Sequence, residues 1–238
     1  MNPDKINITD SQYYNLLAAA YVRGLFMRTK NCSLPKELLE KSLGNLSDTE
    51  IEMILQSGKE ANAKLYAFKN THTDMPRVKR VTGFLKSIGF ESLLDVGSGR
   101  GVFLFPFMEE FPWVRVSSID VLPHRVEFLQ DITNGGIDRL NVFEGDICAQ
   151  PFADNSFDVV TMLEVLEHIP DVEKAILSAV KIARKHIVVT VPSKPDNNPD
   201  HIHLLTKDVL TDLFGRAGCT RLRFDGVTGH LFMVATVM

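Results

Sequence analysis

From Glu91 to the end of the chain, short β-prone runs alternate with segments of helical periodicity. Strands that are each reached through a helix or another crossover connection form parallel sheets with helices on both faces. The alternation therefore predicts an α/β fold with a doubly wound, mostly parallel sheet. We expect strands near 92–96, 114–119, 140–144, 157–162 and 186–191, and helices over 101–111, 123–132, 164–184 and 206–217.

The last two β-prone runs, 220–226 and 230–237, are separated by only three residues. A parallel crossover needs about a dozen residues or more. These runs are therefore predicted to form a C-terminal antiparallel hairpin, which brings the expected sheet to seven strands.

The first ninety residues have helical patterns instead. Capping boxes are indicated at 9–12 and 47–50, and Asp74 precedes a further apolar-periodic segment. Helices are expected over about 9–29, 35–43, 47–68 and 74–88. We expect a helical N-terminal cap at 1–90 and a ligand-binding domain at 91–238.

Composition limits the class of protein. The 238 residues are 45% hydrophobic and 24% charged, which excludes a disordered chain and a coiled coil. The three cysteines are far apart and lack metal-ligand spacing. No secretory start or membrane-spanning run is evident, so a cytoplasmic protein is expected. Residues 1–90 carry a net charge of +4 and residues 91–238 a net charge of −8, so a nucleic-acid partner is disfavoured.

A glycine-rich turn, DVGSGRG at 95–101, follows the first expected strand. Ligands of open parallel sheets bind beyond the carboxyl ends of the strands, and glycines let a ligand approach bare main chain. A dinucleotide loop of the G-x-G-x-x-G kind would place its third small residue at 102, where this chain has Val102. Asp95 suits a ligand that carries cationic groups.

DVGSGRG resembles motif I of the class I S-adenosylmethionine-dependent methyltransferases, and the resemblance extends over residues 91–238. It implies S-adenosylmethionine as the cofactor, with Asp95, Gly97 and Gly99 in its site. Asp120 lies 21 residues after Gly99, where that family has an acidic residue. A carboxylate there can accept both hydrogen bonds of a ribose diol, which alone does not separate this cofactor from NAD.

Two further segments carry the resemblance. Gly145-Asp146-Ile147 is similar to the family's adenine site, which implies that Asp146 accepts from the exocyclic amine and that Ile147 packs on the ring. Residues 151–171 look like the type 11 group, which implies that Glu164 borders the cofactor.

A cluster of carboxylates and imidazoles has a less certain function. Glu164, Glu167 and His168 are expected on one side of the helix after the fourth strand, and His201 follows the fifth. Such groups could hold a divalent metal, and the pattern is similar to that of small-RNA 3′-end 2′-O-methyltransferases. The sequence then departs from that pattern, with Lys207 in place of an arginine. No metal site is therefore expected from the sequence.

The predicted function is methyl transfer from S-adenosylmethionine, by in-line displacement, to a small-molecule acceptor, with the N-terminal helices closing over the site. This reaction needs no nucleophile from the protein, so no catalytic residue is predicted. The alternatives are a metal-assisted RNA ribose 2′-O-methyltransferase, a nucleotide-binding oxidoreductase and a non-catalytic cofactor-binding protein. The chain is expected to be a monomer or a homodimer without a membrane partner.

Overall fold

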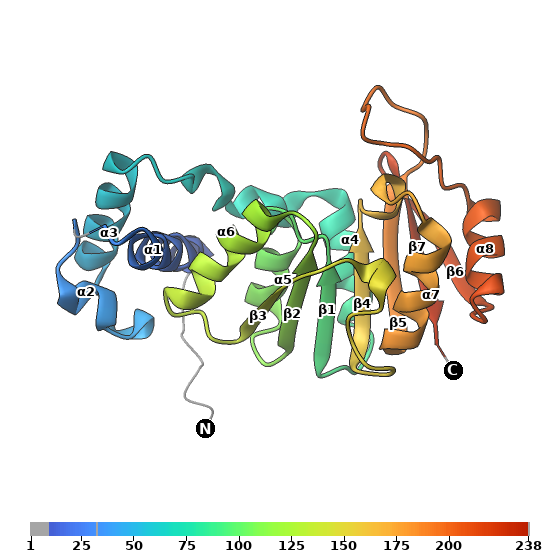
Figure 1. The fold of residues 1–238 in the computed structure, drawn as a ribbon, viewed down its shortest axis with the longest axis horizontal. Helices are drawn as coiled ribbons and strands as arrows, with labels where there is room; N and C mark the ends of the chain where they lie inside the picture. Colours follow the sequence, from blue (N-terminus) through green and yellow to red (C-terminus); the bar gives the residue numbers. More distant parts are fainter. Residues whose placement is uncertain (1–9, 32, 238) are drawn as a thin grey trace.

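The structure, a computed structural model, describes residues 10–31 and 33–237. A sheet lies between two layers of helices, and a further group of helices lies beyond one edge of the sheet (Figure 1). The first capping box expected from the sequence includes Thr9, which lies outside the described residues. Within the described part, no helix is long and apolar enough to cross a membrane.

The sheet has seven strands in the order β3-β2-β1-β4-β5-β7-β6. The first five strands are parallel, and β7 pairs antiparallel with both β5 and β6. This arrangement confirms the predicted doubly wound sheet with its C-terminal hairpin. The strand order reverses between β1 and β4, which is where open α/β sheets bind ligands. The strands are β1 (Ser92–Val96), β2 (Arg115–Asp120), β3 (Leu140–Glu144), β4 (Phe157–Leu163), β5 (Ala183–Pro192), β6 (Arg221–Val227) and β7 (His230–Thr236).

Helices cover both faces of the sheet because the strands are apolar on both sides. Leu93 packs into one core cluster and its neighbour Leu94 into the other, since successive side chains of a strand point to opposite faces. One face is covered by α4 (Pro76–Leu85), α5 (Leu104–Glu110) and α6 (Pro123–Asn134), and the other by α7 (Val172–Ile182) and α8 (Lys207–Arg216).

The N-terminal helices lie at the β3 end of the molecule, where α1 packs along α6 (Figure 1). The two helices approach each other closely at Gly24, where an added Cβ would lie only 1.8 Å from the Asp131 carbonyl oxygen. Arg28 binds the buried Asp131 carboxylate through two hydrogen bonds of 2.8 and 2.9 Å. The helices of this group are α1 (Asp10–Thr29), α2 (Lys36–Glu40), the 3₁₀ helix η1 (Leu43–Asn45) and α3 (Asp48–Glu60).

Helix α3 begins at the predicted capping box, in which Ser47 and Glu50 bond to each other's main chain. The predicted continuation towards Phe68 is wrong, because the helix ends at Glu60 and Asn62 turns the chain with φ +57°. Two 3₁₀ helices follow, η2 (Leu65–Ala67) and η3 (Asn70–Asp74). Asp74 does not cap α4 as predicted but pairs with Lys79, its carboxylate 2.8 Å from Nζ.

The predicted helix over 164–184 is also wrong in its first part. The chain leaves β4 through Glu164 at φ +58°, forms the 3₁₀ helix η5 (Leu166–His168) and enters α7 only after Asp171. Pro170 explains the delay, because proline disfavours the helical conformation of the residue before it, and Ile169 is extended.

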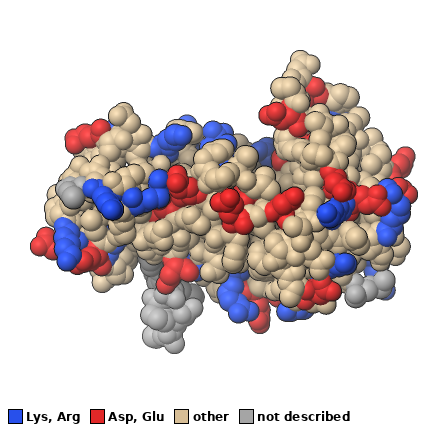
Figure 2. Space-filling model, viewed as in Figure 1, with Lys and Arg blue, Asp and Glu red and all other residues tan. Residues whose placement is uncertain are grey.

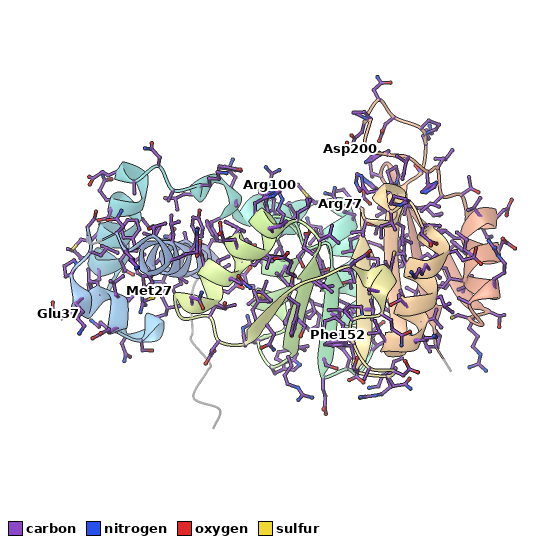
Figure 3. The ribbon with its side chains drawn as sticks, in the orientation of Figure 1. Met27, Glu37, Arg77, Arg100, Phe152 and Asp200 are labelled. Carbon is purple, nitrogen blue, oxygen red and sulfur yellow. The ribbon has the colours of Figure 1, made fainter. Side chains whose placement is uncertain are left out.

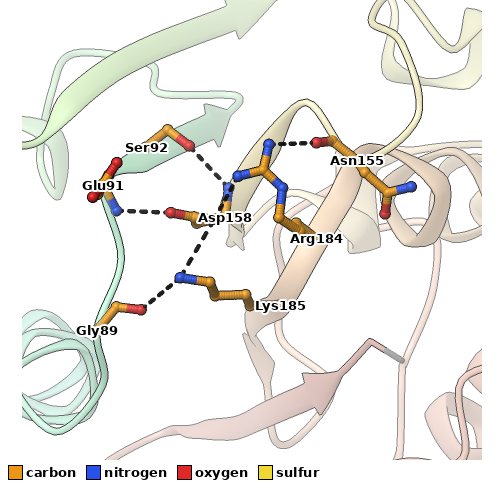
Figure 4. A network of polar contacts seen from close by, with 7 residues as sticks. All are labelled: Gly89, Glu91, Ser92, Asn155, Asp158, Arg184 and Lys185. Atoms are coloured by element: carbon orange, nitrogen blue, oxygen red, sulfur yellow. Dashed lines mark hydrogen bonds and ion pairs between the residues drawn. The ribbon is translucent and has the colours of Figure 1, made fainter.

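At the amino ends of β1, β4 and β5, a polar network surrounds Asp158 (Figure 4). The Asp158 carboxylate accepts from the Glu91 amide at 2.8 Å and from Arg184 at 3.0 Å. Its side chain is 3% exposed. The network joins the three strands at the end of the sheet opposite the ligand edge.

Candidate cofactor site

The loop after β1 holds its three glycines in the left-handed region. The φ angles of Gly97, Gly99 and Gly101 are +66°, +56° and +77°. A Cβ at Gly97 would lie 2.7 Å from Val165, and one at Gly101 would lie 2.4 Å from the Phe105 ring. At Gly99 the nearest such atom is 3.9 Å away, so this residue leaves its main chain open to a ligand.

Asp95 lies beneath this loop and is 2% exposed. Its carboxylate accepts a hydrogen bond from the Thr161 hydroxyl on β4, at 2.6 Å. Burial raises the pKa of Asp95 to about 6; hydrogen bonds from Ser98 and Thr161 oppose this, and the charge of Asp120 adds to it. A cationic group bound nearby would favour the ionised carboxylate.

Asp120 ends β2 and faces the loop. Its two carboxylate oxygens accept from the amides of Gly99, at 3.3 Å, and Leu122, at 3.0 Å. Each carboxylate oxygen has two lone pairs, so both oxygens keep one for a ligand hydroxyl. The structure thus brings together Gly99 and Asp120, two of the predicted site residues.

Val121 and Leu122 follow Asp120 and were not among the predicted site residues. They are large apolar side chains, 57% and 47% exposed. Together they form an apolar surface beside the Asp120 carboxylate that could cover a flat ring. Two apolar residues directly after an acidic strand end were the available sequence signal.

The predicted adenine-site residues lie after β3. The Asp146 carboxylate accepts from the Cys148 amide at 2.8 Å and caps the 3₁₀ helix η4 (Ile147–Ala149). Ile147 is 3% exposed and packs in the core. Its side chain therefore offers little surface to a ring in this arrangement, whereas Asp146 is exposed.

Glu164 is fixed by the strands across the edge of the sheet. Its amide donates to the Thr190 carbonyl, and its two carboxylate oxygens lie 2.8 Å from the Thr190 hydroxyl and 2.9 Å from His230 Nε2. These contacts hold a residue that is not glycine at a positive φ. The carboxylate thus lies at the carboxyl end of β4. The next residue, Val165, packs against Gly97 of the glycine loop.

Glu167, His168 and His201 come together, although not on one helix face as predicted. Glu167 and His168 lie in η5, and His201 lies in the loop after β5. One ligand atom from each residue lies within 4.8 Å of the others. Glu167 is fully buried, and burial raises its pKa to about 8. Glu164 is not part of this group.

Two residues of the N-terminal part, Tyr66 in η2 and Phe68 after it, contact the glycine loop and α5. The Arg100 guanidinium lies over the Tyr66 ring at 5.5 Å, and Phe68 stacks on Phe105 with ring centroids 5.5 Å apart. Figure 3 shows Arg100 and Arg77 at this same edge of the sheet. Helix α1 lies against α6 instead, beside the site rather than over it.

A cleft of about 670 Å³ lies elsewhere, between α4 and α5. Lys79, Lys86 and Trp113 are among its lining residues, and none of the predicted cofactor residues is. The cofactor site inferred from the loop and the strand ends is therefore separate from this cleft.

Comparison with known proteins agrees with this geometry. Residues 94–188 match the family described as "Methyltransferase domain". The matched residues include the glycine loop, Asp120 and all of β4. Residues 94–188 are thus similar to known methyltransferase domains.

Among curated relatives, the ubiquinone/menaquinone biosynthesis C-methyltransferase of Dinoroseobacter shibae is 32% identical over 96 residues, which are 40% of this chain and 38% of that protein. The 27-O-demethylrifamycin SV methyltransferase of Amycolatopsis mediterranei is 35% identical over 107 residues, 44% of this chain and 39% of that protein. The chain thus spans about two fifths of the length of these methyltransferases.

Among solved structures, an S-adenosylmethionine-dependent methyltransferase from Aquifex aeolicus superposes with a TM-score of 0.58 at 18% identity. The alignment covers 77% of this chain and 98% of that one. At this identity the likeness concerns the fold, and it confirms the class I methyltransferase arrangement of the sheet.

Proposed function

We propose that this chain transfers the methyl group of S-adenosylmethionine to a small-molecule acceptor. The observation that carries the proposal is the contact between the open Gly99 main chain and the Asp120 carboxylate at the switch point of the sheet. Two matched relatives are named as methyltransferases of ubiquinone/menaquinone biosynthesis and of 27-O-demethylrifamycin SV, and these names support a small-molecule acceptor.

The residues at the edge of the sheet fit this cofactor. Gly97 and Gly99 would lie along it, and Asp120 would accept from its ribose hydroxyls. Val121 and Leu122 offer an exposed apolar surface for the adenine ring, next to Asp120. Three neighbouring features thus fit the cofactor: the open main chain at Gly99, the Asp120 carboxylate with its free lone pairs, and the apolar surface that follows it.

Four further predicted residues complete the proposed site. Asp146 is exposed and could accept from the exocyclic amine, and Glu164 borders the site at the end of β4. Asp95, beneath the loop, would stabilise the cationic part of the cofactor once ionised. Ile147 would contribute from the core, behind Asp146.

The bound cofactor supplies a methyl group already activated by its positively charged sulfur. The protein therefore has to align the acceptor atom with that methyl group and exclude water, and proximity lowers the barrier by several kcal/mol. No nucleophile from the chain is required. A general base contributes only for acceptors that must lose a proton, and no residue is assigned to this task here.

Charge supports a small acceptor over a nucleic acid. The face shown in Figure 2 has acidic side chains across the sheet region; its basic side chains lie in small groups, one of them along the upper edge, and do not form one continuous basic surface. Nucleic-acid binding depends on clustered Lys and Arg. We propose accordingly a cytoplasmic enzyme, monomeric or homodimeric, that acts on a dissolved metabolite.

The test is to incubate the protein with methyl-labelled S-adenosylmethionine and a fractionated cell extract. Label is expected in a small-molecule fraction, and an Asp120→Ala variant should incorporate much less of it. Label in RNA or protein would contradict the proposed acceptor class. Absence of label from every fraction would contradict the proposed activity.

A further inference from the structure

Glu167, His168 and His201 form a three-residue cluster at the carboxyl edge of the sheet. Their ligand atoms lie within 4.8 Å of one another, and the two imidazole rings have centroids 4.7 Å apart. Two segments separated by more than thirty residues supply them, η5 and the loop after β5. The main chain fixes this pairing, because the Ile202 amide donates to the Glu167 carbonyl at 3.0 Å.

The hydrogen bonds of the two rings determine which nitrogen carries the proton. His168 Nδ1 lies 2.8 Å from the Asp200 carbonyl oxygen, and His201 Nδ1 lies 2.8 Å from an Asp196 carboxylate oxygen. Both oxygens can only accept, so Nδ1 is the donor in each ring. The neutral tautomer then has a free lone pair on Nε2 of each ring.

Metal-binding histidines are held in the same way. Their second ring nitrogen donates to a backbone carbonyl or a carboxylate, which fixes the ring and raises its basicity. His168 shows the carbonyl form of this contact and His201 the carboxylate form. Both hydrogen bonds are made by Nδ1, and among the described residues no hydrogen-bond partner is found for Nε2 of either ring.

The third member, Glu167, has no partner for its carboxyl oxygens. The Glu167 side chain is 0% exposed, and neither of its oxygens accepts a hydrogen bond from any described residue. A buried carboxylate without a partner is costly. A cation bound between the carboxylate and the two rings would remove that cost.

We propose that Glu167, His168 and His201 bind a divalent transition-metal ion of the Zn²⁺ class. Two imidazoles and one carboxylate are a common zinc ligand set, and they disfavour Mg²⁺, which prefers oxygen ligands. Tetrahedral zinc ligands lie about 3.3 Å apart, so the side chains close in slightly when the ion binds. Both Glu164 oxygens are engaged by Thr190 and His230, which leaves it outside the set.

Three protein ligands leave one position of a tetrahedral ion open. On the proposed function, an oxygen of the acceptor would take this position, next to the residues that border the cofactor. This last step rests on the proposed methyl transfer, whereas the metal site itself does not.

Binding of Zn²⁺ alone tests the site, without cofactor or acceptor. Chelator-treated protein is titrated with Zn²⁺ against a chromophoric chelator, and Co²⁺ is used as a spectroscopic substitute. We expect one ion per chain, a visible Co²⁺ spectrum typical of nitrogen ligands, and much weaker Mg²⁺ binding. Equal affinity for Mg²⁺ and Zn²⁺, or no Zn²⁺ binding, would overturn the proposal.

Variants assign the ligands. Glu167→Gln and His201→Ala should each weaken Zn²⁺ binding at least as much as Asp196→Asn, for which a loss of about 10- to 100-fold is expected. His203→Ala is the matched control, because His203 lies in the same loop but bonds to the Ile169 carbonyl. An equal loss in His203→Ala would overturn the assignment. If Glu167→Gln does not fold, His201→Ala and Asp196→Asn, both in the loop, still decide it.

Discussion

The Gly99 amide donates a hydrogen bond to the Asp120 carboxylate over 3.3 Å. This contact ties the glycine loop after β1 to the end of β2 at the point where the strand order reverses. It places an open main chain next to an acceptor-rich carboxylate, which is the arrangement that a nucleoside ligand requires.

Replacing Asp120 should therefore weaken cofactor binding. Asp120→Ala removes the acceptor for the ribose and one contact of the loop, and we expect a loss of about 10- to 100-fold in affinity for S-adenosylhomocysteine. Asp138→Ala changes an exposed carboxylate before β3 and is the matched control. Calorimetric titration of both variants measures the difference, and equal affinities would refute the role of Asp120.

Asp95 should make stability depend on pH. Its folded-state pKa is raised from 3.8 to about 6, so between these values the folded state holds a proton that the unfolded chain has lost. The free energy of unfolding should then fall as pH rises through this window, by about 3 kcal/mol in total. Urea unfolding of the wild type and Asp95→Asn at several pH values tests this. Parallel pH profiles for the two proteins would count against it.

The contact between α1 and α6 depends on Gly24. A Cβ there would lie 1.8 Å from a backbone oxygen of α6, so Gly24→Ala should force the helices apart and cost at least about 2 kcal/mol of stability. Gly83 lies in α4 with no atom within 4 Å of the added Cβ. Gly83→Ala should therefore stabilise the protein, by about 0.5–1 kcal/mol. Thermal unfolding of both variants compares the two effects, and similar midpoints would contradict this packing.

Asp158 should matter for stability and not for cofactor binding. Burial opposes its ionisation, but the Glu91 amide and the cations of Lys185 and Arg184 hold the pKa of Asp158 below its usual range. Its stabilising contribution is therefore present at neutral pH and is lost as pH falls through that lowered pKa. Asp158→Ala should cost about 1–2 kcal/mol at pH 7, because the two cations are about half exposed and screened by solvent. Affinity for S-adenosylhomocysteine should be unchanged in the folded variant; a large loss would show that the two ends of the sheet are coupled.

Much of the fold could be predicted because its signals are local. The period of apolar residues and the three-residue link before β7 placed all seven strands, and the Ser47 capping box marked the start of α3. The helix predicted directly after β4 was wrong for a physical reason. Its helical pattern is real, but Pro170 delays the helix and Glu164 adopts a positive φ that contacts from β5 and β7 hold in place.

The candidate site shows the same division. The glycine loop and Asp120 follow from strand ends, which a sequence marks well. The burial of Ile147, the exposure of Val121 and the convergence of His168 with His201 depend on contacts between distant segments. Spacing along the chain marked Glu167, His168 and His201 as candidate metal ligands, but it cannot supply such contacts, so only the fold shows that these three converge without Glu164.

Calorimetric titration of the wild-type protein with S-adenosylhomocysteine and, separately, with NADH decides which nucleotide this chain binds. We expect one S-adenosylhomocysteine site per chain, with an affinity that falls about 10- to 100-fold in Asp120→Ala, and no binding of NADH. Binding of NADH without binding of S-adenosylhomocysteine would contradict it.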